Sequence, residues 1–271
     1  LEGSEDAWLL KLASDGSPEW QVAYGSAGAN QRLVSVRQTK DEGYIAAGSW
    51  TVACCTSAWL MKLAPNGEIE WQRTYGAEGI QTARDVITVE SSTGYLFVGR
   101  TEPPDLDSDA WLVRVEPTGE VLWQVRLGRR GTEDRAEAII ETVDGRFLFV
   151  GTTASFGSGR DDVWVARIDT DGTAGWQAAY GSGGDDRGHG VFSTRGGGFV
   201  IAGDTSSFGG GRVDAWALEI DATGAIQWQN AYGGRHHERA VSLAPTPEGG
   251  VAMLVNVEVT LCVMRTEANG D

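Results

Sequence analysis

Cysteine is nearly missing from this sequence, which contains only three in 271 residues. Two of them, Cys54 and Cys55, are adjacent, and cysteines that are neighbours in the chain rarely bridge each other because their Cα atoms lie too close together. The third is Cys262. This count excludes the dense disulfide framework of a small secreted domain, and it leaves the redox compartment open.

Positive charge is also scarce, because 22 Lys and Arg face 38 Asp and Glu and the net charge is −16 at pH 7. A surface of that sign argues against nucleic acid as a partner, because a phosphate backbone needs basic contacts. No apolar run approaches the ~18 residues of a membrane-spanning helix, so we expect no membrane insertion. We expect a monomer outside the cell or at its surface, although no signal peptide is visible in this chain.

Catalytic motifs are missing as well. The sequence has neither the G-x-S-x-G elbow of the serine hydrolases nor the H-E-x-x-H of the zinc proteases, and no basic residue beside Cys54-Cys55 would activate a thiol. Two carboxylates for glycoside hydrolysis can be chosen among 38 acids in many ways, and only geometry decides between them. The sequence therefore favours a non-catalytic protein.

Tryptophan, in contrast, is abundant and periodic. One series recurs every 51 to 53 residues inside apolar segments: Trp8, Trp59, Trp111, Trp164 and Trp216. A second series keeps these spacings, and each member follows a turn glycine by four residues: Trp20, Trp71, Trp123, Trp176 and Trp228. A third landmark is a short apolar strand, led by glycine in four of its five copies. Its copies start at Gly43, Gly94, Arg146, Gly198 and Gly250. Three landmarks in five copies predict five repeats of one unit, approximately 6–56, 57–108, 109–161, 162–213 and 214–266.

Each repeat reads as four β-strands. Apolar segments of six to nine residues are bounded by Gly, Asp, Asn and Ser, and pairs such as Asp15-Gly16 and Asn66-Gly67 are typical of hairpin turns. Four strands with their turns need about 50 residues, which is the length of a propeller blade. The sequence predicts an all-β protein, a single five-bladed β-propeller over residues 1–271 in which tryptophans pack between the blades.

The order D-A-W-L-x-K-L, D-G-x-x-x-W, Y-G and G-Y-x-x-x-G resembles the bacterial β-propeller repeats called SBBP repeats. Residues 118–123 and 223–228, which read T-G-x-x-x-W, are also similar to the tryptophan-docking motif of quinoprotein propellers. The resemblance covers nearly the whole chain and implies the propeller architecture. It implies no particular function, since such repeats occur in proteins with diverse roles.

Propeller convention gives the strands of a repeat the letters A to D, and places the D–A and B–C loops on one face at the mouth of the central channel. The chain starts in a C strand and ends in one, and its last A and B strands (239–255) lack a following D strand. Residues 19–24 could supply that strand and close the ring beside residues 260–266, so that no sheet edge stays open at the seam. Which of the two terminal C strands is then displaced remains open.

An arginine precedes each strand A, in the series Arg32, Arg84, Arg135, Arg187 and Arg239. Two interpretations are open. Five guanidinium groups around the channel mouth would bind a carboxylate, phosphate or sulfate. Alternatively, the arginines latch each blade to the next through Asp6, Asp109, Asp162 and Asp214, and we favour this latch. The second repeat has Ser57 in place of the aspartate, which makes Arg84 the best candidate for a ligand contact.

The histidines fall in the D–A loops of the last two repeats, as His189, His236 and His237. They are candidate ligand contacts, and with Asp161, Asp185 and Asp186 they are weak candidates for a metal site, although their spacing fits no known ligand motif. Acidic B–C loops are a weak candidate for calcium, through Asp105, Asp107, Asp161 and Asp162. Otherwise we expect no cofactor.

The B–C loops differ most between repeats, and variable loops on a constant scaffold are typical of binding sites. We therefore predict a binding module whose partner is a glycan, an acidic small molecule or a protein, held on the D–A and B–C loop face at the channel mouth. The alternative is a hydrolase or lyase that acts on polysaccharide with carboxylates at that mouth.

Overall fold

The computed structural model describes residues 5–104, 107–258, 260–267 and 270. Its regular secondary structure is entirely strand, as predicted, and no helix in these ranges is long and apolar enough to cross a membrane. The contacts divide the chain into two compact units, Leu1–Gly131 (unit 1) and Thr132–Asp271 (unit 2). That the whole chain forms one domain stays a prediction.

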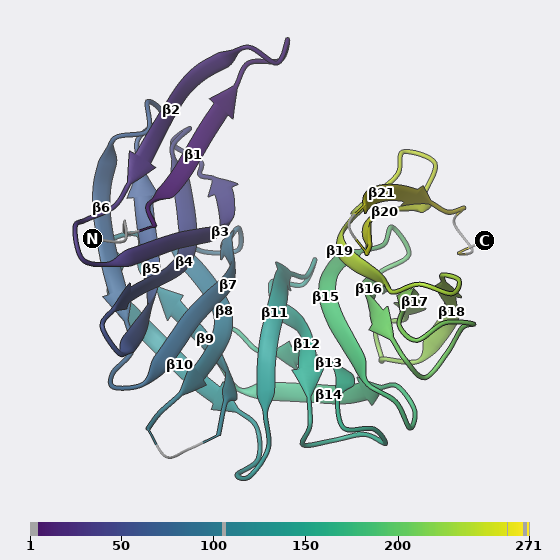
Figure 1. Cartoon of the computed structure of the whole chain (residues 1–271). Helices are drawn as coiled ribbons and strands as arrows, with labels where there is room; N and C mark the ends of the chain where they lie inside the picture. The colour runs from purple at the N-terminus through teal and green to yellow at the C-terminus, as the bar shows by residue number, and fades with distance from the viewer. Residues whose placement is uncertain (1–4, 105–106, 259, 268–269, 271) are drawn as a thin grey trace. The chain divides into compact units, whose positions relative to one another are not determined.

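Unit 1 begins with a two-stranded sheet and continues with two four-stranded blades (Figure 1). The first sheet contains β1 (Ala7–Leu12) and β2 (Pro18–Tyr24). The blades are β3 (Asn30–Gln38), β4 (Tyr44–Val52), β5 (Cys55–Leu63) and β6 (Ile69–Tyr75), then β7 (Ile80–Thr88), β8 (Tyr95–Glu102), β9 (Asp109–Val115) and β10 (Val121–Leu127). Each blade is an antiparallel meander, and one parallel bridge from Thr56 to Ile80 joins the two blades.

Unit 2 contains two complete blades and a three-stranded sheet. The strands are β11 (Asp134–Glu141), β12 (Phe147–Thr153), β13 (Asp162–Ile168) and β14 (Ala174–Tyr180); β15 (Asp186–Ser193), β16 (Phe199–Thr205), β17 (Asp214–Ile220) and β18 (Ile226–Tyr232); and β19 (Glu238–Pro245), β20 (Val251–Val257) and β21 (Thr260–Arg265).

The predicted strand letters fit this order, since β1 and β2 are a C and a D strand and β19 to β21 are an A, a B and a C strand. The 21 strands correspond to about five blades. Within the described residues no sheet joins β2 to β21. Closure of the ring and the number of blades therefore stay predictions.

Every A strand has a β-bulge at the same place, after Leu33, Ala83, Ala136, Gly188 and Ala240. The bulge brings a backbone carbonyl of strand A against strand B, and this explains the second glycine of the G-Y-x-x-x-G pattern. A Cβ on Gly48 would lie 1.8 Å from the carbonyl oxygen of Arg32, and one on Gly203 would lie 1.9 Å from that of Arg187. Only glycine fits this close backbone approach.

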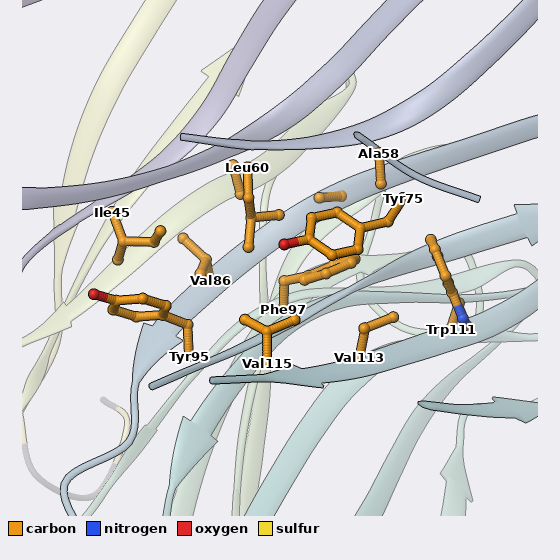
Figure 2. Close-up of a cluster of buried hydrophobic side chains, with 12 residues drawn as sticks. Ile45, Ala58, Leu60, Tyr75, Val86, Tyr95, Phe97, Trp111, Val113 and Val115 are labelled. Carbon is orange, nitrogen blue, oxygen red and sulfur yellow. The ribbon is translucent and has the colours of Figure 1, made fainter. Parts of the chain in front are cut away.

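Aromatic side chains join consecutive blades inside each unit. Tyr75, at the end of β6, donates a hydrogen bond to the carbonyl oxygen of Gly119 in the next C–D turn (2.8 Å), and Tyr180 does the same to Gly224 (2.7 Å). Figure 2 shows the core between the two blades of unit 1, where Tyr75 and Phe97 have ring centroids 5.3 Å apart. Burial in this core raises the pKa of the Tyr75 phenol far above its usual range.

The two tryptophan series differ in burial. Trp59, Trp111, Trp164 and Trp216 on the C strands are at most 4% exposed, as the packing model predicts. Trp8 is 59% exposed, because its strand β1 pairs only with β2. The D-strand series is half-buried, and so is Trp50, which belongs to neither series. The D-strand indoles lie on the blade surface and reach the next turn by their edge. Trp71 is the example, since its Nε1 donates to the carbonyl oxygen of Pro117 (2.9 Å).

Candidate functional site

The strand register aligns one position at the start of each strand A with a partner on strand B. The pairs are Arg32 with Ser49, Thr82 with Arg100, Arg135 with Thr152, Arg187 with Asp204, and Arg239 with Asn256. Thr82 takes the second place, so Arg84 does not belong to the predicted arginine series. Arg84 lies at the bulge instead, as His189 does in unit 2. It therefore stands two residues after the position of the other arginines, although its spacing in the sequence is regular.

The remaining four arginines have different surroundings. Arg187 donates from Nε to Asp161 Oδ2 (2.8 Å), and Arg135 pairs with Glu137 (3.0 Å). Arg32 and Arg239 are exposed and have no hydrogen bond or ion pair within the described part of the chain. The series therefore does not act as one uniform set.

The predicted latch through the aspartate series is not what the structure shows. Asp162 and Asp214 are each 1% exposed, and they accept hydrogen bonds from backbone N–H groups of their own B–C loops instead. Arg187 reaches Asp161, the half-buried neighbour of Asp162, because Asp162 itself is buried in the sheet core. Burying Asp162 beside Asp186 raises its pKa, chiefly through loss of solvation.

Asp161 and Asp185 form a cluster with two arginines, and Arg187 also lies 3.9 Å from the buried Asp204. Arg160 contacts both oxygens of Asp185 (3.2 and 2.9 Å), and Arg187 lies 2.7 Å from Asp161 and 3.5 Å from Asp185. These two metal candidates are therefore already neutralised by guanidinium groups. Asp186, the third candidate, is fully buried and separate from this cluster; Asp105 lies outside the described residues.

The histidines do not converge on one site. His189 pairs with the buried Asp204, and His236 Nδ1 lies 2.7 Å from Glu258. His237 is exposed and forms an isolated backbone bridge with Val213. Within the described ranges, no group of three or more His, Cys, Asp or Glu side chains could hold a metal ion.

At the B–C loop end of the blades, unit 1 has two pockets that the sequence did not predict. The first, of about 460 Å³, is lined by Trp50, Val52, Cys55, Ser57, Trp59, Gln72, Arg73 and Thr74. The second, of about 440 Å³, lies one blade further on and is lined by Gly76, Ala77, Glu78, Gln81, Thr101, Pro103, Trp111, Gln124 and Arg126. Both volumes are in the range of small-ligand sites.

Both pockets are built around the same pair of residues. The C-strand indole donates to a D-strand glutamine, from Trp59 Nε1 to Gln72 Oε1 (3.2 Å) and from Trp111 Nε1 to Gln124 Oε1 (3.1 Å). These bonds fix the amides so that each glutamine Nε2 is left to donate elsewhere. In the first pocket Trp50 lies edge-on to Trp59, with ring centroids 5.3 Å apart.

In unit 2 a phenylalanine from the B–C loop lies against the corresponding tryptophan. Phe156 contacts Trp164, and Phe208 contacts Trp216, with ring centroids 5.7 and 5.4 Å apart. The corresponding loops of unit 1, residues 51–57 and 102–108, contain no phenylalanine. The presence or absence of a phenylalanine in the B–C loop is the sequence signal that would have located these pockets.

No family model and no curated protein matches the chain. Solved structures do resemble it. A protein of unknown function from Bacteroides caccae has a TM-score of 0.58 at 13% identity, over 100% of this chain and 89% of that one. The WD40 domain of Neurospora crassa Pan2 has a TM-score of 0.54 at 12% identity, over 86% of this chain and 62% of the other.

A third similar structure is the GH93 α-L-arabinofuranosidase of Fusarium graminearum in complex with arabinobiose. Its TM-score is 0.60 at 10% identity, over 88% of this chain and 78% of that chain. WD40 domains are β-propellers, so the likeness shows a propeller-like fold. At these identities it shows the fold alone.

Proposed function

We propose that this chain is a non-catalytic β-propeller module that binds a carbohydrate in the pockets of unit 1, at the blade end formed by the D–A and B–C loops. One observation carries the proposal: a pocket of about 460 Å³ lies open beside Trp50 and Trp59, where the blades of unit 2 have a phenylalanine against the tryptophan. The scaffold is the same, so the difference lies in the loops, where binding specificity usually resides.

The lining of this pocket suits a sugar ring. A pyranose presents C–H groups on its faces and hydroxyl groups around its rim. The half-buried indole of Trp50 and the side chain of Val52 offer apolar contact, while Ser57, Thr74 and the Gln72 amide offer hydrogen bonds. A mainly apolar wall with a few polar groups is typical of a ligand site.

The same lining argues against the hydrolase alternative. Glycoside hydrolysis needs two carboxyl groups on either side of the bond that breaks. The eight residues that line the first pocket include no Asp or Glu, and the second pocket has only Glu78. A bound sugar would therefore meet no acid and base pair in either place.

A glycan array probed with the whole chain tests this proposal. The best oligosaccharide is then titrated by calorimetry against the wild type, Trp50→Ala and Trp71→Ala. Trp71 is a matched control, since it is a half-buried tryptophan of the same unit that lines neither pocket. We expect Trp50→Ala to weaken binding at least about tenfold, or 1.4 kcal/mol, and Trp71→Ala to leave it unchanged.

Three outcomes contradict the proposal. The array shows no binding, or Trp50→Ala binds as well as the wild type, or chromatography of the incubated oligosaccharide shows shortened products. The last outcome supports the hydrolase instead. Binding only of acidic small molecules or of a protein would point instead to an exposed arginine on a strand A, either Arg32 in unit 1 or Arg239 in unit 2.

A further inference from the structure

Two polar positions recur at each blade junction within a unit, and at the two junctions of unit 2 they meet over one glycine. The first precedes the C-strand tryptophan by two residues, and the second opens the following strand A. The pairs are Asp6 with Gln31 and Ser57 with Gln81 in unit 1, and Asp162 with Asp186 and Asp214 with Glu238 in unit 2. Unit 1 thus has one neutral amide in each pair, whereas unit 2 has two acids in each.

At the last junction both acids are buried and incompletely bonded. Asp214 is 1% exposed and Glu238 is 7% exposed. Asp214 Oδ1 and Glu238 Oε2 have no hydrogen-bond partner in the structure. A Cβ added to Gly233 would lie 2.0 Å from the first oxygen and 2.8 Å from the second, so the two oxygens face the same small space.

Backbone carbonyl groups surround the same space. A Cβ added to Gly211 would lie 2.5 Å from Gly234 O, 2.9 Å from Asp214 Oδ1 and 3.1 Å from His236 O. Asp214 Oδ1 therefore lies close both to Glu238 Oε2 and to two backbone carbonyl oxygens, and neither carboxylate oxygen has a donor. Desolvated carboxylates in such a place need either a counter-ion or a proton.

The preceding junction shares the facing acids but not the lack of donors. A Cβ on Gly181 would lie 2.2 Å from Asp162 Oδ1 and 2.5 Å from Asp186 Oδ2. Asp186 Oδ2, however, already accepts hydrogen bonds from the Ser182 N–H (3.0 Å) and from the Ser207 hydroxyl (2.6 Å). Asp214 and Glu238 therefore differ from this pair, because each of them has a buried oxygen without a donor.

Unit 1 shows what occupies the equivalent space when an amide is present. With its nitrogen toward the carbonyls, the Gln31 amide donates to Glu5 O (3.2 Å) and Ala29 O (3.0 Å). Ala29 precedes Gln31 by two residues, just as His236 precedes Glu238. In the next blade Gln81 Nε2 donates to Glu78 O (3.1 Å). The amide nitrogen thus supplies positive charge density to carbonyls that, in unit 2, face acids.

We propose that unit 2 binds a calcium ion between Asp214 and Glu238, completed by backbone carbonyls of the adjoining loops. In unit 1 the amides of Gln31 and Gln81 replace the ion. The ion neutralises the paired acids and ties one blade to the next.

The donor set selects the ion. All the facing atoms are carboxylate or carbonyl oxygens, which hard cations prefer, and no His or Cys side chain contributes. Calcium tolerates an irregular oxygen shell at 2.3–2.6 Å, whereas magnesium demands an octahedron and keeps several waters. Two oxygens on one calcium lie at most about 5 Å apart, and the facing oxygens of Asp214 and Glu238 beside Gly233 satisfy this limit.

Calorimetric titration of the EDTA-treated whole chain with CaCl₂ tests the proposal, with MgCl₂ as the comparison. We expect one calcium ion per chain, with a dissociation constant on the order of 10⁻⁴ M, as in extracellular calcium modules. Glu238→Gln, which installs the residue that unit 1 already uses, should abolish binding. Asp186→Asn, at the junction whose acid is already hydrogen-bonded, should leave the stoichiometry at one. Glu68→Gln, an exposed acid of unit 1, is the matched control for the lost charge.

The reverse variant keeps the test valid if a unit 2 variant does not fold. Gln31→Glu gives the first junction two acids, so it should bind a second calcium ion. A folded wild type that binds no calcium overturns the proposal. Calcium binding that survives Glu238→Gln also overturns it, because the ion then lies elsewhere.

Discussion

Unit 1 and unit 2 share one blade scaffold and differ in what occupies its B–C loop end. In unit 2, Phe156 and Phe208 lie against the C-strand tryptophans, and the junctions hold paired buried acids. In unit 1 two pockets of about 460 and 440 Å³ lie beside the equivalent tryptophans, and each pair contains a glutamine. The strands therefore maintain the fold in both units, while the side chains at this end of the blades differ.

This comparison predicts equal behaviour where the scaffold is shared. Trp59 in unit 1 and Trp164 in unit 2 are each 1% exposed, so replacing either by alanine should cost about 3–5 kcal/mol of unfolding free energy. Urea unfolding followed by circular dichroism measures the loss. Trp8, which is 59% exposed, is the control and should cost much less. A large difference between the two buried positions would show that the units do not share their core energetics.

Much of this shared scaffold could be predicted from the sequence. The tryptophan series and the turn glycines fix strand order and repeat length, because each strand needs an apolar face and each turn needs a residue that tolerates positive φ, as Gly67 and Gly119 do. The burial of the C-strand tryptophans follows from the same pattern.

The site could not be predicted in the same way, because it depends on register and on single contacts. The β-bulge moves Arg84 out of the arginine series, and equal spacing in the sequence cannot show a bulge. The burial of Asp162 directs Arg187 to Asp161, although the sequence offers both aspartates side by side. The pockets arise from the lack of one loop phenylalanine, which matters only once the loop is folded against Trp59.

Removing the aromatic side chain of a filled blade should make unit 2 resemble unit 1. Phe208 is half-buried against Trp216, so Phe208→Ala should destabilise the chain by about 1–3 kcal/mol, less than for a fully buried phenylalanine. It should also open a cavity that a small apolar probe can enter, measured as a rise in the melting temperature when the probe is added. A variant as stable as the wild type would mean that Phe208 packs no differently from a surface residue.

The paired acids predict an opposite pH response at two aspartates of unit 2. Burial and Asp186 raise the pKa of Asp162 above 3.8, so its contribution to stability is present below that value and is lost as the pH rises through the folded pKa. In EDTA, Asp162→Asn should remove this loss. Hydrogen bonds from Thr173 lower the pKa of the exposed Asp171, so its contribution is lost instead as the pH falls below 3.8. Unfolding free energies across the acid range, measured for both variants, separate the two signs; identical profiles would contradict the burial argument.

The smallest effects should separate the arginines that the sequence treats as equivalent. Arg187 is held by Asp161 and Asp185 at a partly exposed position, where an ion pair contributes about 0.2–1 kcal/mol, so Arg187→Ala should lower stability by that amount. Arg239 has no partner among the described residues, so Arg239→Ala should change stability by less than about 0.5 kcal/mol. High salt should narrow the difference, because screening weakens exposed ion pairs first. Urea midpoints at low and high ionic strength provide the measurement. If Arg239→Ala proves as costly as Arg187→Ala, then Arg239 has a structural role, and it ceases to be a candidate for ligand contact.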